Sequence, residues 1–195
     1  MKYYIEITLI KNTELTVNQL WTRLYTQVHL AFVEHKDSQG HTPFGVAFPQ
    51  YRYHQEKKLG SLGGKLRIFA VTESLLIDLN LTKWLAGLED MIHYTGIKPV
   101  PQVTTFATYQ RKQYKTSAER LANHRLKHHN DMTFEQAVIY YTPRLKISDL
   151  PYIQLKSLTN QQMFKLFIKK SEVREAVAGN FSSYGLSAAV SVPDF

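Results

Sequence analysis

The sequence predicts an α+β protein in which an N-terminal domain over residues 1–109 is followed by a smaller C-terminal domain over residues 110–195. In the first domain, segments that alternate between apolar and polar residues, as strands do, are interleaved with segments whose apolar residues recur at helical spacing. The chain has 195 residues, which is enough for one large domain or two small ones. Its 44% hydrophobic and 21% charged residues are typical of folded globular proteins, so neither disorder nor a fibrous repeat fits.

The N-terminal domain is expected to begin with a strand and a helix. Residues 3–9 alternate with a period of two, which predicts a half-buried strand. Thr16 and Gln19 have the spacing of a helix-capping box, and the apolar residues that follow recur at helical spacing. We therefore expect a helix that runs to about His35.

Four more elements complete the predicted N-terminal domain. Strands are expected at residues 40–49 and 65–71, separated by a glycine-rich turn. Apolar residues between 81 and 92 form a helical stripe that stops near Gly96, and residues 103–109 are rich in β-forming side chains. The resulting order, βαββαβ, is the ferredoxin-like pattern.

The C-terminal domain is expected to contain a basic helix. A polar, basic connector at residues 110–115 leads to a second capping box, Thr116 and Glu119, which opens a helix to about His129. A short helix is expected at residues 133–141. Strands of a smaller unit are expected at residues 153–157, at residues 163–169 and around Tyr184.

The composition excludes several classes of protein. Cysteine is absent, which removes disulfides, thiolate nucleophiles and zinc sites built on sulfur. No apolar run approaches the roughly 18 residues of a membrane helix. The first ten residues alternate like a strand and lack the basic and apolar stretches of a secretory signal, so we expect a cytoplasmic protein with no membrane partner.

The charge favours a polyanionic partner. The formal net charge is +8 at pH 7, with a pI near 9.5. Residues 1–109 hold eleven bases and nine acids, whereas residues 110–195 hold thirteen bases and seven acids. The second part of the chain is therefore the expected contact with phosphates.

His29 is the first candidate for chemistry. It lies on the predicted first helix, one position from the apolar stripe, with Tyr25 and Phe32 one turn away on either side. An unperturbed histidine titrates near neutrality, so it can accept or supply a proton. The alternative is a histidine at the boundary of the core, which spacing alone does not distinguish from a catalytic one.

Basic residues are concentrated around the predicted basic helix. Between residues 111 and 129 the chain holds six lysines and arginines and three histidines against a single acid, Glu119. Such a run can be a solvated helix face or it can bind the phosphates of RNA or DNA. The interleaved Tyr109 and Tyr114, together with the uneven charge, favour nucleic acid.

A metal site on this helix is not expected. His124 and His128 are four residues apart and share a helix face, as metal-binding histidines can. However, no glutamate directly follows His124, as a zincin motif requires, and Arg125 and Lys127 would repel a cation.

Eight short motifs stand out along nearly the whole chain. They are VHLAF around His29, GVAFP at residues 45–49, RKQ at 111–113, SAERL at 117–121, QLKS from Gln154, MFKLFIKK at 163–170, FSSYGLS at 181–187 and VPDF at 192–195. In this order and spacing they resemble the subtype I-F CRISPR-associated endoribonuclease family, which cuts precursor CRISPR RNA at its repeat hairpins.

The resemblance implies RNA cleavage that needs neither a metal nor another cofactor. In that reaction the 2′-hydroxyl upstream of the scissile phosphate attacks it, leaving a 2′,3′-cyclic phosphate and a 5′-hydroxyl. By their positions in the motifs, His29 is implied as the catalytic histidine, Ser157 as the serine that helps to place the ribose hydroxyl, and Tyr184 as the active-site tyrosine.

The resemblance also implies contacts with the RNA hairpin. Arg111 and Gln113 match residues that read base edges near the foot of the stem, and Phe164 matches an aromatic residue that stacks under the closing base pair. The family's basic helix enters the major groove of the stem, but residues 122–124 replace part of its arginine run, so a weaker or more pH-dependent grip on phosphate is expected. The full set of expected RNA-binding residues is Arg111, Lys112, Gln113, Lys115, Arg120, His124, Arg125, Lys127, His128 and Phe164.

The implied partners are a CRISPR repeat hairpin and other subunits of the type I-F surveillance complex. Two alternatives remain open on the residues alone. The chain could be a subunit that binds the hairpin without cutting it, since the same basic helix serves both roles. It could also be a ferredoxin-like protein-interaction domain that does not bind RNA at all.

Overall fold

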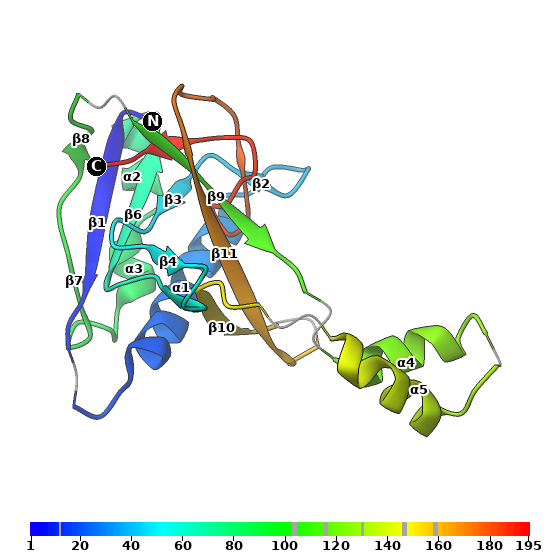
Figure 1. The fold of residues 1–195 in the computed structure, drawn as a ribbon. Coiled ribbons are helices and arrows are strands. Elements are labelled where there is room, and N and C mark those ends of the chain that lie inside the picture. Colours follow the sequence, from blue (N-terminus) through cyan, green and yellow to red (C-terminus); the bar gives the residue numbers. More distant parts are fainter. Residues whose placement is uncertain (12, 103–104, 115–116, 130, 146–147, 158–159) are drawn as a thin grey trace. The chain divides into compact units, whose positions relative to one another are not determined.

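The computed structural model describes the chain except for residues 12, 103–104, 115–116, 130, 146–147 and 158–159. The chain forms two compact units, which we call the larger unit (residues 1–112 and 150–195) and the smaller unit (residues 113–149). The expected domain boundary between residues 109 and 110 falls inside a strand, β9 (Phe106–Lys112) (Figure 1). Division into domains at that boundary stays a prediction.

The first sheet of the larger unit is antiparallel (Figure 1). Its strands lie in the order β3 (Gly45–Ala47), β6 (Lys65–Ala70), β1 (Tyr3–Leu9) and β7 (Ile92–Tyr94), and β8 (Lys98–Pro99) also pairs with β1. The alternation of β1 buries Ile5 and Ile7, which lie opposite Ile68 and Leu66 in β6. The predicted N-terminal strand is therefore confirmed.

Helix α1 (Val17–Glu34) begins and ends where the sequence predicts. Thr16 and Gln19 form the capping box, because the Thr16 hydroxyl accepts from the Gln19 N–H and the Gln19 side chain accepts from the Thr16 N–H. From Leu20 to Phe32 the apolar stripe of the helix, which includes Tyr25, is buried in the larger unit, whereas Val17 at its start is exposed. This packing fixes the rotation of α1, and with it the direction in which His29 projects.

The single helix expected over residues 81–92 is wrong. Only the first part of this region is helical, as α3 (Leu81–Leu85), and Ile92 begins strand β7. Another short helix, α2 (Glu73–Asp78), precedes it. Gly87 has a φ of +85°, a left-handed conformation that stops a helix, and Ile92 pairs with Leu9 of β1. The apolar spacing arose from a helix and a strand that face the same core.

The second sheet of the larger unit corrects two expectations. Its antiparallel strands lie in the order β10 (Tyr152–Lys156), β11 (Met163–Val173), β9 and β13 (Val192–Pro193). The strand expected at 103–109 is β9, which belongs here rather than to the first sheet, and residues 103–104 lie outside the described part. Residues 110–112, expected in a connector, continue β9 because they pair with β11.

Short hairpins and pairs complete the larger unit. Strands β4 (Arg52–His54) and β5 (Leu59–Ser61) form a hairpin that the sequence did not predict. Strand β12 (Phe181–Ser182) pairs with β2 (His41–Thr42), which brings the C-terminal segment beside the end of α1.

The smaller unit holds α4 (Ala118–Leu126), α5 (Phe134–Tyr141) and a 3₁₀ turn, η1 (Thr142–Arg144). The cap of α4 is Ser117, whose hydroxyl accepts from the Arg120 N–H, whereas the expected Thr116 lies outside the described residues. The helix ends at Leu126 rather than near His129, where the His128 N–H makes a tighter, 3₁₀-type bond to the Arg125 carbonyl at 3.0 Å. The helix expected at 133–141 is confirmed as α5.

Within the described residues, the structure contains no helix that is both long enough and apolar enough to cross a membrane.

Candidate active site

A pocket opens on the larger unit where α1, β10 and the turn after β12 meet. Its volume is about 190 Å³, below the roughly 300–1,000 Å³ of pockets that enclose a whole small ligand, so it suits part of a polymer. The residues that line it are Thr26, His29, Leu30, Leu155, Lys156, Ser157, Phe164 and Tyr184. Three sequence-distant segments thus bring together His29, Ser157, Tyr184 and Phe164, the residues that the family resemblance implies.

His29 is held in one tautomer. Its Nδ1 lies 2.8 Å from the backbone carbonyl oxygen of Ser183, and a carbonyl only accepts hydrogen bonds, so Nδ1 carries the proton. In the neutral ring, Nε2 then has a free lone pair and can accept a proton. The ring also stacks on Tyr184, with centroids 4.1 Å apart and planes at 5°.

The surroundings keep His29 neutral. Partial burial lowers the pKa of His29, opposed by the hydrogen bond to the Ser183 carbonyl, which favours the protonated ring. The positive charges of Arg111 and Lys36 lower the pKa further. The imidazole is therefore a base rather than an acid at neutral pH.

The backbone at Tyr184 is fixed by a hydrogen bond to its carbonyl and by the conformation of the next residue. The Tyr25 hydroxyl, on α1, donates to the Tyr184 carbonyl at 2.8 Å. The next residue, Gly185, has a φ of +69°, and a Cβ there would lie 2.7 Å from the Phe32 ring. Only glycine fits this conformation and this approach, so the FSSYGLS motif places the tyrosine ring against His29.

Ser157 and Phe164 approach the pocket from the second sheet. Ser157 follows β10 directly and its N–H donates to the Gln162 carbonyl at 2.9 Å, which closes the turn toward β11. Phe164 lies opposite Leu155 in the pairing of β10 with β11. The intervening residues 158–159 are outside the described part.

Arg111 lies beside the same aromatic side chains. It is part of β9 and pairs with Ile168 of β11. Its guanidinium carbon is 5.2 Å from the Tyr184 ring centroid and 5.5 Å from that of Phe164. Its Nε is buried with no hydrogen-bond partner among the described residues. Lys112 follows in β9, half-buried.

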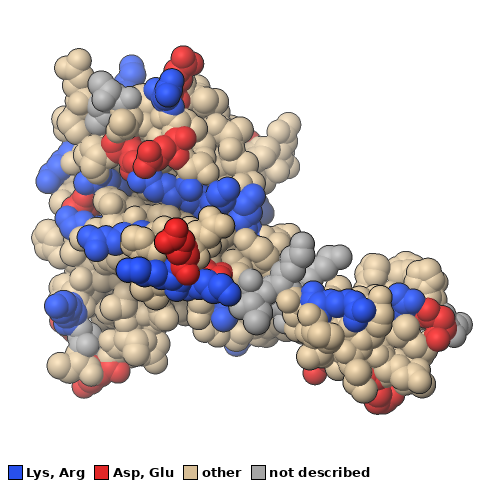
Figure 2. All heavy atoms as spheres, in the orientation of Figure 1, with Lys and Arg blue, Asp and Glu red and all other residues tan. Residues whose placement is uncertain are grey.

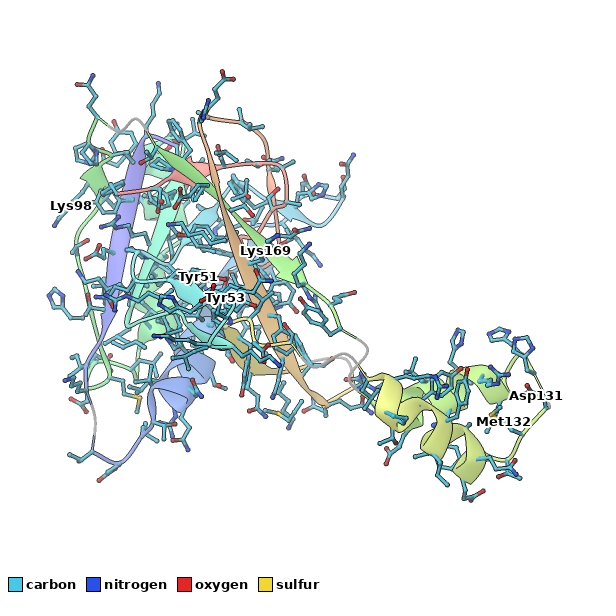
Figure 3. The ribbon with its side chains drawn as sticks, in the orientation of Figure 1. Tyr51, Tyr53, Lys98, Asp131, Met132 and Lys169 are labelled. Carbon is cyan, nitrogen blue, oxygen red and sulfur yellow. The ribbon has the colours of Figure 1, made fainter. Side chains whose placement is uncertain are left out.

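The other expected RNA-binding residues belong to the smaller unit, and Lys115 lies outside the described residues. Arg125 is already engaged: it pairs with Asp131, which Figure 3 labels, with an Nε to Oδ1 distance of 3.2 Å. Its guanidinium carbon also lies 5.8 Å from the centroid of the Tyr140 ring. The rings of His124 and His128 lie 4.8 Å apart. The remaining members are all exposed: Gln113, Arg120, His124, Lys127 and His128.

Lys156 is a pocket residue that the sequence analysis missed. It is exposed and precedes Ser157, so the QLKS motif itself contained the signal, a cation next to the implied catalytic serine. Among the described residues, no group of three or more histidines and carboxylates could hold a metal ion.

Comparison with known proteins identifies the family. A family model described as CRISPR-associated protein (Cas_Csy4) matches residues 4–195. Two relatives named CRISPR-associated endonuclease Cas6/Csy4, from Escherichia coli (strain UTI89 / UPEC) and Pseudomonas aeruginosa (strain UCBPP-PA14), are each 32% identical over 197 residues. In both alignments the match covers 100% of this chain and 100% of the relative.

Two solved structures also align, "An RAMP protein binding different RNA substrates" and "CRISPR associated protein Cas6". The first covers 98% of this chain and 99% of its own, at 9% identity. The second covers 99% of this chain and 98% of its own, at 11% identity. Their TM-scores of 0.36 and 0.34 are too low to support an argument, so the assignment depends on the family model and the two relatives. By those matches, the chain belongs to the CRISPR-associated Cas6/Csy4 family of endonucleases.

Proposed function

We propose that the chain is a metal-independent endoribonuclease that cuts precursor CRISPR RNA at its repeat hairpins. The observation that carries this proposal is the geometry of His29, whose Nδ1 is bound to a carbonyl while Nε2 has no hydrogen bond to any described residue, in a pocket that Ser157 and Tyr184 also line. A base held in this way is what cleavage by the RNA's own 2′-hydroxyl requires.

The proposed reaction forms one bond and breaks one. The 2′-oxygen upstream of the cut attacks the phosphorus, the O2′–P bond forms and the P–O5′ bond breaks. Nε2 of His29 takes the hydroxyl proton, and the 5′-oxygen leaves and gains a proton from solvent. The products are a 2′,3′-cyclic phosphate and a 5′-hydroxyl, and no cofactor is consumed.

The neighbours of His29 have separate roles in this proposal. Ser157 places the ribose hydroxyl, and the ring of Tyr184 keeps the imidazole in its plane. Lys156 lines the same pocket, and its positive charge suits the negative charge that builds on the phosphate oxygens in the transition state.

RNA recognition is proposed for residues both inside and outside the pocket. Arg111 is supported as a reader of a guanine edge by the position of its guanidinium beside Phe164 and Tyr184, two residues of the pocket, and Phe164 as a stacking platform by its place in the pocket. Gln113 would read a neighbouring base. The proposed phosphate contacts are Lys112, Lys115, Arg120, His124, Arg125, Lys127 and His128.

We further propose a ferredoxin-like N-terminal domain over residues 1–109 and an RNA-binding C-terminal domain with a basic helix over residues 110–195. The strand order β7, β1, β6, β3 in the antiparallel first sheet supports the former. The chain is proposed to act in the cytoplasm with other subunits of the type I-F surveillance complex.

The test uses the chain's own repeat hairpin in excess chelator. Cutting is expected to persist, to leave a 2′,3′-cyclic phosphate, and to stop when the nucleotide upstream of the cut lacks its 2′-hydroxyl. Loss of cutting in chelator that returns with a divalent metal would refute the metal-independent mechanism. Binding without any cutting would favour the alternative, a subunit that only holds the hairpin.

A further inference from the structure

A second pocket lies on the larger unit and shares no lining residue with the pocket of His29. It forms where the start of β4 meets β11, and Figure 3 labels three of its side chains: Tyr51, Tyr53 and Lys169. Its lining residues are Tyr51, Tyr53, Leu150, Lys169, Lys170 and Glu172. Its volume, about 460 Å³, is within the roughly 300–1,000 Å³ of pockets that hold one small ligand.

The two tyrosines give the pocket a fixed wall and an exposed ring. The Tyr51 hydroxyl donates to the Ile168 carbonyl of β11 at 3.1 Å, and its ring meets Tyr109 edge-on at 6.3 Å. Tyr51 is therefore held in place. Tyr53, in β4, is 36% exposed, so an aromatic ligand can stack on its ring.

The charges around the pocket are of both signs. The Lys170 ammonium lies 2.6 Å from an Asp194 carboxylate oxygen, so its charge is already balanced. Lys169 and Glu172 are exposed and have no ion pair within the described residues. A groove that only tracks phosphates would gain nothing from Glu172, whereas a carboxylate can accept a hydrogen bond from the amino group of a base while a cation contacts the phosphate.

We propose that this pocket binds one unpaired nucleotide of RNA. The base stacks on Tyr53, an exocyclic amino group of the cytosine type donates to Glu172, and the phosphate contacts Lys169. Lys and Arg side chains gather in bands on the face of the larger unit that carries β11, which suits a backbone that continues beyond the pocket (Figure 2). The identity of the RNA rests on the proposed function, since a precursor continues as single strand beyond its hairpin.

The test measures binding of labelled hexacytidylate and hexauridylate to the full chain, free and saturated with the repeat hairpin. Hexacytidylate should bind more tightly than hexauridylate in both states. Tyr53→Ala should weaken hexacytidylate binding by about 5- to 150-fold, the effect of losing one stacked base, while Tyr53→Phe should keep it. Glu172→Gln should remove the preference for cytosine.

The charge contact is tested separately. Lys169→Ala should lower the slope of log affinity against log salt by about 0.7, the value for one phosphate contact of a single strand. Lys98→Ala is the matched control, because Lys98 is an exposed lysine on β8 that is not part of the pocket (Figure 3).

Three results would overturn the proposal: equal binding of the two oligonucleotides, no effect of Tyr53→Ala, or complete loss of hexacytidylate binding once the hairpin is bound. A Tyr53 variant that binds both oligonucleotides normally but no longer associates with a protein subunit would make the pocket a protein-docking surface instead. Hairpin cutting by the wild type is measured in the same series. If the wild type neither binds nor cuts the hairpin, the proposed function fails, whatever the pocket does.

Discussion

Replacing His29 by alanine should separate cutting from binding. The ring hydrogen-bonds through Nδ1 to the Ser183 carbonyl and stacks on the Tyr184 ring, and within the described part of the chain Nε2 has no hydrogen bond, so it remains for the RNA. Loss of a general base slows a reaction by about 10²- to 10⁴-fold, or about 2.7 to 5.5 kcal/mol of barrier. Loss of one hydrogen bond to the RNA costs about 0.5–1.5 kcal/mol, so affinity should fall by only about 2- to 13-fold.

The assay is single-turnover cutting of the repeat hairpin beside its equilibrium binding. His29→Asn is a second variant, whose amide can still donate to the Ser183 carbonyl but cannot act as the base. His35→Ala is the matched control, since His35 follows the same helix and also bonds a backbone carbonyl, that of Ala31, at 2.8 Å. A proportional loss of cutting and binding, or an equal slowing by His35→Ala, would refute the role of His29.

Three further outcomes are expected. Because burial lowers the pKa of His29, the acidic limb of the pH profile of kcat/KM should have its midpoint below 6.5. Arg111→Ala removes a repelling positive charge, so it should move that midpoint upward. A midpoint well above 6.5 in the wild type would contradict this expectation. In equilibrium binding assays, Arg111→Ala should also cost about 1–3 kcal/mol of hairpin affinity and relax the preference for one guanine, whereas equal weakening of all hairpins would mean a phosphate contact only. Asp131→Asn should tighten hairpin binding at low salt, because it frees Arg125 from its ion pair and removes a negative charge. Unchanged affinity would mean that Arg125 does not contact the RNA.

The sequence predicted the elements whose signals are local. The capping box of Thr16 and Gln19 marked the start of α1 correctly, because a cap depends on side chains within one turn. The alternation of residues 3–9 predicted β1, because one face of that strand is buried. Where two elements shared one apolar face, as between Leu81 and Ile92, periodicity alone could not tell a long helix from a helix and a strand.

The pairing of strands depended on contacts that no local pattern contains. The polar, basic residues 110–112 resemble a connector, yet they form β9 hydrogen bonds with β11, more than fifty residues later. Polar side chains are tolerated there because this end of the strand is only half-buried. The same pairing puts Arg111 beside Phe164 and Tyr184, which spacing along the chain could not predict.

The catalytic arrangement explains why residue types alone left His29 undecided. Many catalytic histidines are oriented by a carboxylate, and such a partner can be sought in a sequence. Here a backbone carbonyl, that of Ser183, orients the ring, and any residue supplies a carbonyl. What makes this carbonyl special is the turn around it, which depends on the left-handed Gly185 and on the bond from Tyr25 to the Tyr184 carbonyl. The signal for a catalytic base therefore lay in the conformation of a loop more than 150 residues away. The FSSYGLS motif encodes that conformation, whereas the residues next to His29 in the sequence do not.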